Sequence, residues 1–379
     1  MNGFWLSDEQ QAIRESVARL CERFDAAYWR KTDETGVFPE DFVAAMAGAG
    51  WLGVAMPTEL GGAGLGLTEA AIVMQTVAES GAGFSGASAI HLNIFGLMPV
   101  VKFGSDDLRR TAIPRIISGE DKTCFAVTEP DAGLDTTSLK TRAVRTNDGY
   151  VISGRKMWTT NAQRATKMLI IARTTPKAEV KRPTEGLSLF YTDFDRTRIT
   201  ATPIPKMGRK AVESNAVFID DLHVPAEHLV GEEGQGFRYL LEGLNAERVL
   251  IGAEAVGLGR AALGRAAAYA KDRVVFGRPI GQNQGVAHPL ARAWAELEAA
   301  SLMAFKAAAL HDAGRDCGAE AGFNACEAAV MAHGGMGYAK EFDVERYFRE
   351  AMIARIAPVS REMILNYIAE RVLGLPKSY

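Results

Sequence analysis

The sequence predicts an α+β fold in which a β region lies between two helical regions. Apolar residues recur at every third or fourth position toward both ends of the chain, while the middle holds short runs of β-branched and aromatic residues. A chain of 379 residues is also too long for one small core. We therefore predict a helical N-terminal domain over residues 1–121, an antiparallel β domain over 122–232 and a helical C-terminal domain over 233–379.

The N-terminal region has the pattern of helices separated by glycine and proline clusters. The predicted helices lie within residues 10–24, 39–54, 67–80 and 105–119. The glycine-rich segment GGAGLG (61–66) lacks the preceding strand that a dinucleotide-binding fold needs. We interpret it as a loop.

The middle region predicts a compact antiparallel sheet. An Asp148-Gly149 pair marks a turn between two of its strands. The predicted strands lie within residues 123–129, 139–146, 150–158, 167–175, 187–194, 198–205 and 215–224.

After Glu232 the helical period returns and persists almost to the end of the chain in four long segments. The segment 242–270 carries two acids, Glu247 and Glu254, which are seven residues apart and so share roughly one face. A carboxylate on the packed side of a helix is costly unless it is paired, exposed at an end or used in chemistry. These two acids are therefore candidate functional residues.

Composition and charge are those of an ordinary soluble globular protein, with 47% hydrophobic residues and a net charge of −3. The charge gives no general attraction to nucleic acid or to acidic membranes. The N-terminus lacks a signal-peptide pattern, and the apolar stretch 43–56 is too short and too glycine-rich to span a bilayer. The cysteines show no disulfide or metal spacing, and no metal site is expected. We expect a cytoplasmic protein.

Two segments of the β region have residues that suit a planar, polar ligand. In VTEPDAG (127–133) a strand ends in Thr128 and a turn of small residues that exposes backbone N–H groups, although an ordinary turn has the same pattern. In KMWTTNA (156–162) Trp158 offers a flat apolar surface, and Thr159 or Thr160 a hydroxyl. Packing in the sheet core is the alternative for this segment.

Two segments of the C-terminal region suit a phosphate-bearing ligand. Arg273 and Phe276 can contact a pyrophosphate and a base, although a solvated arginine at a helix end is equally consistent. Gly334 and Gly335 would allow close approach of a ligand or another backbone.

The order and spacing of these segments resemble the acyl-CoA dehydrogenase flavoprotein family over nearly the whole chain. The matching motifs are PTELGGAGLG, VTEPDAG, KMWTTNA, VPAEHLVGEEGQGF, DRVVFGRPIGQNQ and GGMGYAKEFDVERYFREA. The resemblance implies a C-terminal four-helix bundle that assembles homotetramers. It also implies FAD held between domains and partly by a neighbouring subunit, with an acyl-CoA as substrate and an electron-transferring flavoprotein as electron acceptor.

The resemblance assigns cofactor and substrate roles residue by residue. Leu134 stands where the family usually has a serine, so a hydroxyl contact is lost while backbone contacts remain. Asn245, Arg248 and Leu134 are the implied substrate contacts. The implied FAD contacts are Phe125, Val127, Thr128, Gly133 and Leu134 along the flavin edge and pyrophosphate, Trp158, Thr159 and Thr160 over the flavin, Arg273, Phe276 and Gln284 at the adenosine diphosphate half on the partner chain, Gly334 and Gly335 beside that half, and Ser360.

The family reaction removes an α-proton to a carboxylate and a β-hydride to flavin N5, which leaves a trans-2-enoyl-CoA. Most members carry the carboxylate in a C-terminal loop, but here Pro358 occupies that position. A minority, typified by isovaleryl-CoA and some long-chain enzymes, place it at the position of Glu247. We therefore predict that Glu247 is the catalytic base; pairing with Arg248 or another basic residue is its alternative role. Glu254 is expected in tetramer packing or a salt bridge, and is the second candidate base.

Pro358 raises a second question. The family's backbone N–H at this position donates to the thioester carbonyl, and proline has none. Either Ala357 or Val359 supplies this donor, or the chain performs different chemistry, such as that of a flavin monooxygenase or oxidase on the same scaffold. A nucleic-acid-associated flavoprotein is disfavoured because basic and acidic residues nearly balance over 333–379. The sequence does not predict the length or branching of the acyl chain.

Overall fold

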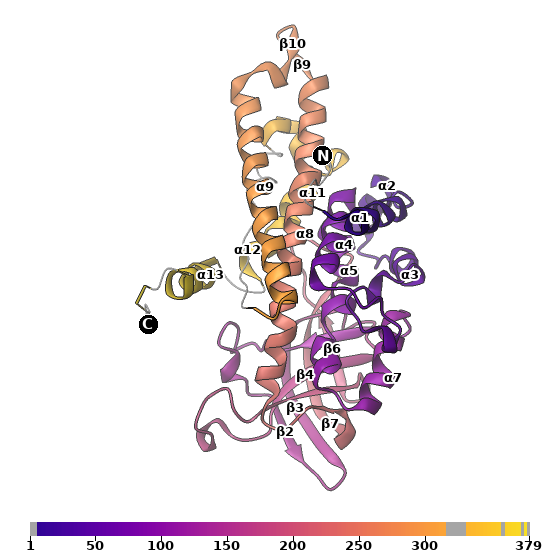
Figure 1. The fold of residues 1–379 in the computed structure, drawn as a ribbon, viewed down its shortest axis with the longest axis vertical. Helices are drawn as coiled ribbons and strands as arrows, with labels where there is room; N and C mark the ends of the chain where they lie inside the picture. Colours follow the sequence, from indigo (N-terminus) through magenta and orange to yellow (C-terminus); the bar gives the residue numbers. More distant parts are fainter. Residues whose placement is uncertain (1–5, 316–330, 358–360, 373–374, 377–379) are drawn as a thin grey trace.

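The computed structural model describes residues 6–315, 331–357, 361–372 and 375–376. A helical N-terminal domain and a β domain lie beside each other, and a long pair of C-terminal helices extends beyond them, one of which also packs on the β domain (Figure 1). The α+β architecture of helices, sheet and helices is therefore confirmed.

The N-terminal domain is built from short helices around a buried pair, α4 and α5. Each of the four predicted helical segments contains a helix, whereas α2, α5 and α6 were not predicted. Nearly every side chain of α5 is buried, so its sequence has no polar face to give a helical period. The helices are α1 (Asp8–Cys21), α2 (Ala26–Thr35), α3 (Glu40–Gly48), α4 (Leu67–Val77), α5 (Gly83–Phe95), α6 (Met98–Phe103) and α7 (Asp106–Ile117), with 3-10 turns at Trp51–Gly53 and Thr58–Leu60 and a π-helical turn at Ala78–Ala82.

The most apolar helical run was not the one identified from the sequence. The run Leu67–Phe103 is long and apolar enough to cross a membrane by length and composition alone, whereas residues 43–56 were singled out above. In the fold, 83% of its most apolar window is buried inside the protein. The run is therefore apolar because its helices lie in the protein core.

The β domain has strands in all seven predicted segments. The sheet order is β6-β7-β3-β2-β4-β5-β8, and β1 pairs with β4. Most pairings are antiparallel as predicted, but β1 and β2 both run parallel to β4, and strand patterns alone do not reveal these pairings. The strands are β1 (Thr123–Ala126), β2 (Arg142–Arg145), β3 (Gly149–Thr160), β4 (Lys167–Arg173), β5 (Leu187–Asp193), β6 (Ile199–Pro203), β7 (Ser214–Pro225) and β8 (Leu229–Val230).

The C-terminal region begins with two long helices, α8 (Gly236–Asp272) and α9 (Gln284–Asp312). They are joined by a tight hairpin of β9 (Val274–Val275) and β10 (Arg278–Pro279), which lies at the far tip of the pair (Figure 1). The turn needs left-handed backbone at Phe276 and Gly277, with φ of 53° and 76°.

Of the four long helical segments expected after Glu232, the described residues show two, and the last part of the chain is helical but divided into shorter helices. The described residues there form α11 (Val344–Ala351), α12 (Ile353–Ile356) and α13 (Arg361–Tyr367), followed by a π-helical turn at Ile368–Val372. Ala357 is extended because it precedes a proline, which disfavours helical backbone and ends α12. Residues 316–330 lie outside the described part.

Helix α8 connects the two cores of the molecule. Its residues Ala246, Val249 and Leu250 belong to the cluster formed with α1, α4 and α5, and its residues Tyr239 and Leu240 belong to the cluster formed with α7 and the β sheet. Glu247 lies between Ala246 and Val249, in the part of α8 that packs on the core of the N-terminal domain.

Candidate active site

The predicted base lies on the packed side of α8. Glu247 is half-buried and its neighbours Ala246 and Val249 are buried. Burial raises the pKa of Glu247, although the charges of His91, Arg248 and Arg209 oppose this rise and that of Glu254 adds to it. The carboxylate is therefore more basic than one on the surface, which suits it to accept a proton.

The second acid on this face of α8, Glu254, forms a salt bridge with a histidine. Glu254 is 1% exposed, and its Oε1 contacts Nδ1 of His91 on α5, which is 7% exposed. This salt bridge is one of the two roles predicted for Glu254. His91 was missed by sequence analysis, because a helix that is buried on nearly all sides has no polar face against which a histidine stands out.

The predicted substrate contacts Asn245 and Arg248 lie next to Glu247 and contact each other. Arg248 Nη1 donates a hydrogen bond of 2.8 Å to Asn245 Oδ1. Both side chains are half-buried. They therefore form a polar edge beside the carboxylate, on the same helix.

The VTEPDAG loop is tied to the sheet by a buried ion pair. Lys156 is fully buried, and its Nζ lies 3.0 Å from both Val127 O and Glu129 Oε1 and 2.8 Å from Ile171 O. Glu129 also accepts hydrogen bonds from the backbone N–H groups of Lys140 and Thr141, at 2.6 and 2.9 Å. Sequence analysis missed the roles of both ionic residues; the signal was an acid and a lysine that lie within the two predicted ligand segments.

A β-bulge turns Trp158 outward. The pairing of β3 with β7 shifts between Lys156 and Thr159, and Trp158 adopts a φ of 61°. The indole is consequently 55% exposed, whereas Thr159 is buried with its hydroxyl unpaired and Thr160 is half-buried. The side chains of Trp158 and Thr159 therefore face different environments.

The two predicted flavin segments lie side by side. The N–H of Met157, next to Trp158, donates a hydrogen bond of 2.8 Å to Thr128 O. Half-buried Phe125 connects this region to the helices, because its ring lies 6.2 Å from that of Phe95 on α5. The more distal turn of this loop is open, since Gly133 is exposed and Leu134 is 58% exposed.

The other predicted cofactor residues lie far from this region within one chain. Arg273, Phe276 and Gln284 are exposed around the hairpin at the tip of α8 and α9, and Phe276 is fully exposed (Figure 1). Gly334 and Gly335 lie in a 3-10 turn, Gly334–Tyr338. A single subunit thus does not bring them to Trp158.

The C-terminal loop is only partly described. Pro358, Val359 and Ser360 lie outside the described residues. Of the two substitutes named for the missing N–H donor, Ala357 already donates to Ile353 O at 2.9 Å.

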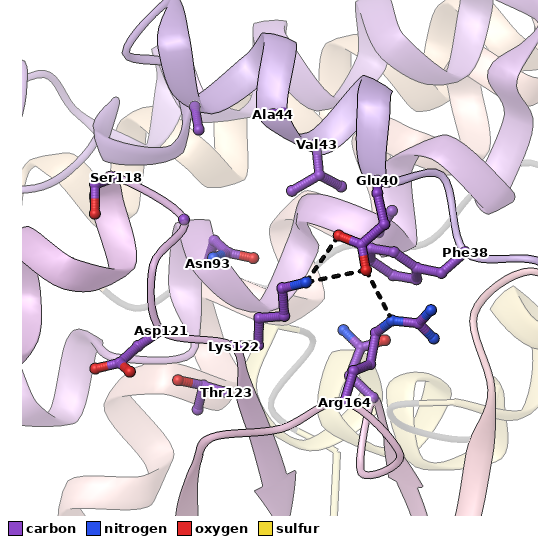
Figure 2. A pocket seen from close by; sticks show the side chains of 14 residues that line it. Phe38, Glu40, Val43, Ala44, Asn93, Ser118, Asp121, Lys122, Thr123 and Arg164 are labelled. Atoms are coloured by element: carbon purple, nitrogen blue, oxygen red, sulfur yellow. Dashed lines mark hydrogen bonds and ion pairs between the residues drawn. The ribbon is translucent and has the colours of Figure 1, made fainter.

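A separate cavity of about 160 Å³ is lined by residues of α3, of α5 and of the segment before β1 (Figure 2). Glu40 on α3 accepts hydrogen bonds from Lys122 and Arg164 across its mouth. None of the predicted site residues lines it. We therefore do not place the predicted chemistry in this cavity.

Comparison with known families accounts for the fold and these segments together. The models for the N-terminal, middle and C-terminal domains of acyl-CoA dehydrogenases match residues 7–120, 124–222 and 234–373. These domains define a flavin-dependent oxidoreductase. The chain belongs to the acyl-CoA dehydrogenase family, and its reaction class is the flavin-dependent dehydrogenation of acyl-CoA.

Individual relatives agree over the full length. The chain is 37% identical to acyl-CoA dehydrogenase FadE12 of Mycobacterium tuberculosis, over 98% of both chains. Among solved structures, a glutaryl-coenzyme A dehydrogenase in complex with glutaryl-CoA has a TM-score of 0.90 and 30% identity, covering 100% of this chain and 98% of that one. Butyryl-CoA dehydrogenase from Megasphaera elsdenii has a TM-score of 0.89 and 26% identity, covering 98% and 100%.

Proposed function

We propose that this protein is an FAD-dependent acyl-CoA dehydrogenase that forms trans-2-enoyl-CoA with Glu247 as the catalytic base. The observation that carries the proposal is the place of Glu247. It is a half-buried carboxylate on α8, next to the polar pair Asn245 and Arg248, in the part of α8 that packs on the core of the N-terminal domain. Family membership gives the reaction class, and Glu247 provides a carboxylate that can accept the α-proton.

The protonation chemistry follows from the environment of Glu247. A base must be ionised before it accepts the α-proton, and its strength increases with its pKa. Burial raises the pKa of Glu247, while the nearby cations oppose the rise. The site therefore combines a strong base with charges that favour its ionised form.

The residues around Trp158 fit a planar cofactor. Trp158 has an exposed indole, the N–H of the preceding Met157 donates to the carbonyl of Thr128, and the buried Lys156 fixes the adjoining Val127 carbonyl. When bound there, FAD would accept the β-hydride of the substrate. Trp158 would cover the ring system, and the backbone of residues 125–134 would contact its polar edge.

The distal half of FAD requires a second subunit in this proposal. Arg273, Phe276 and Gln284 are exposed at the tip of α8 and α9, where they can reach a cofactor bound to another copy. Helix α9 also exposes a row of apolar residues at helical spacing, namely Ala291, Ala295, Ala299 and Leu302. We propose a homotetramer, with an electron-transferring flavoprotein as the electron acceptor.

The test is anaerobic flavin bleaching by a panel of straight, branched and ring-bearing acyl-CoAs. In Glu247→Gln the bleaching rate should fall by about 10²–10⁴, the usual contribution of a positioned general base, while acyl-CoA still perturbs the flavin spectrum. Glu242→Gln is the matched control, because Glu242 lies on the same helix in a surface pair with Lys102 at 2.6 Å. Bleaching of Glu247→Gln at the parent rate would contradict the assignment. If no acyl-CoA bleaches the parent and reduced flavin reacts rapidly with oxygen, the oxidase or monooxygenase alternative replaces it.

A further inference from the structure

One stripe of α8 leads from the proposed base to the protein surface. Arg248 and Asn245 form the polar edge beside Glu247. Leu241 and Arg238 continue this edge at steps of four and three residues toward the start of the helix. Residues at this spacing lie one above another on a helix. We call the set of Arg238, Leu241, Asn245 and Arg248 the α8 stripe.

The two directions along α8 from Glu247 differ in burial. Toward the C-terminal end, every residue from Gly252 to Gly259 is buried. Toward the N-terminal end, Leu241 of the α8 stripe is half-buried and Arg238 is exposed. The phosphates of CoA cannot leave water for a packed interior at an acceptable cost in free energy. The CoA part of a thioester bound at Glu247 therefore leaves toward the N-terminal end of α8.

Arg238 is a cation that is held in place by aromatic rings and has no acidic partner. Its guanidinium carbon lies 6.0 Å from the centre of the Phe103 ring and 5.8 Å from that of Tyr239, and these two rings stack at 4.3 Å. Such contacts orient a guanidinium and leave its N–H groups able to donate. The acid one turn further along α8, Glu242, is paired with Lys102 at 2.6 Å. Arg238 itself forms no ion pair with another described residue.

The length of the α8 stripe matches the length of the arm of CoA. Arg238 lies ten residues before Arg248, which corresponds to about 15 Å along the helix axis. The pantetheine arm between the thioester sulfur and the first phosphorus has about the chain length of four extended residues, roughly 15 Å. A thioester held beside Glu247 can thus place its pyrophosphate at Arg238, where a guanidinium can donate two parallel hydrogen bonds to a phosphate.

We propose that Arg238 binds the pyrophosphate of the CoA moiety and so holds the thioester beside Glu247. The inference rests on the proposed function, because it takes Glu247 as the group that meets the α-carbon of an acyl-CoA. The contact is the same before and during the reaction, since the phosphates take no part in the chemistry. Arg238 therefore contributes to substrate binding and not to the rate of the chemical step.

The test is anaerobic flavin bleaching by one acyl group carried either on CoA or on pantetheine, which has the same arm without the phosphates. In Arg238→Gln the half-saturating concentration of the acyl-CoA should rise about tenfold, the lower end of the range for a hydrogen bond to a charged group. The limiting rate should stay within about twofold of the parent. The acyl-pantetheine should bleach the parent and Arg238→Gln at the same half-saturating concentration. Arg238→Lys keeps a cation that binds phosphate and should remain within about threefold of the parent.

Arg23→Gln is the matched control. Arg23 is an exposed arginine of the N-terminal domain whose guanidinium carbon lies 5.7 Å from the centre of the Phe24 ring. Its replacement removes the same charge and the same kind of aromatic contact, and the half-saturating concentration should not change. Equal shifts in Arg23→Gln and Arg238→Gln would indicate a general effect of charge. Equal shifts for acyl-CoA and acyl-pantetheine would show that Arg238 does not act on the phosphates, and either result would overturn the proposal.

Binding without turnover separates failure of this inference from failure of the proposed function. In flavin-loaded Glu247→Gln, calorimetry measures the affinity for acyl-CoA, and the added Arg238→Gln change should lower this affinity about tenfold. If bleaching depends on Glu247 but the affinity is unchanged, the inference is wrong and the proposed function stands. If Glu247→Gln bleaches like the parent, or no acyl-CoA bleaches the parent, the proposed function fails and the inference fails with it.

Discussion

Lys156 shows how one buried residue supports a binding surface without contacting it. Burial lowers its pKa to about 8, although the carboxylate of Glu129 opposes this. Its ammonium group joins the carbonyl of Val127 to that of Ile171 on β4, so the predicted flavin segment is fixed to the sheet. Glu129 and Lys156 depend on each other, because either alone would leave a buried charge without a partner.

We predict that Lys156→Met lowers the free energy of unfolding by about 3–5 kcal/mol, the usual result of breaking a buried ion pair on one side. FAD retention should also decrease, because Val127 loses its tether. Thermal unfolding and flavin release on gel filtration would measure both. Lys140→Met removes the exposed pair with Asp131, at 3.2 Å, and should cost at most about 1 kcal/mol. Equal effects of the two variants would contradict the role given to Lys156.

At the scale of elements, α4 depends on a cap from a distant part of the chain. Asp312, the last residue of α9, accepts hydrogen bonds from the N–H groups of Leu67 and Thr68 at 2.7 and 2.9 Å, and from the Thr68 hydroxyl at 2.6 Å. These bonds satisfy N–H groups that an isolated helix leaves without partners. Burial raises the pKa of Asp312, but the nearby His311 ring, whose Nδ1 lies 3.9 Å from Oδ1, and the hydrogen bonds from Thr68 and Leu67 outweigh it and lower the pKa to about 2.

The low pKa of Asp312 determines how this cap depends on pH. The folded pKa lies below the ordinary value of 3.8, so the stabilisation is complete above pH 4 and is lost as pH falls toward 2. Asp312→Ala should lower the free energy of unfolding by about 1–2 kcal/mol at pH 7. In urea unfolding the difference from the parent should narrow below pH 4. Exposed Asp220→Ala should stay within about 0.5 kcal/mol at each pH, and a pH-independent difference for Asp312→Ala would contradict the capping role.

Sequence analysis missed α2, α5 and α6, of which α5 is almost fully buried. The strands were predicted well because their β-branched runs are bounded by turn residues, and α8 because it is long. Helix α5 has no polar face, so neither the helix nor His91 was predicted. Glu129 and Lys156 were also missed, because the partner of a buried charge depends on which strands are adjacent. Local sequence patterns do not predict the order of strands in a sheet.

At the scale of the molecule, the family motifs predicted residues that the fold places at opposite ends. Trp158 lies in the β domain, whereas Arg273 and Phe276 lie at the tip of the helical hairpin (Figure 1). Spacing along the chain cannot indicate this separation. The proposed contacts of Arg273 and Phe276 with the cofactor therefore require a second subunit.

We predict a tetramer by light scattering at micromolar concentration, with about one FAD per chain. Arg273→Ala should weaken FAD retention by at least several-fold, because it removes a charge-assisted contact to a pyrophosphate. Arg182→Ala, at an exposed surface pair with Glu185, is the control and should retain FAD like the parent. A monomer, or full retention in Arg273→Ala, would rule out a cofactor site shared between subunits.

The core of the N-terminal domain is completed by residues of α8 and α9, and this affects how the chain folds during synthesis. That core includes Val249 and Leu250 of α8 and Phe305 of α9, and the start of α4 is capped by Asp312. A nascent chain that has reached only the end of the β domain lacks these groups and exposes the apolar surfaces of α4 and α5. Because those contacts span more than 150 residues, we expect slow, late consolidation of the first domain and a need for chaperone protection until α9 has left the ribosome.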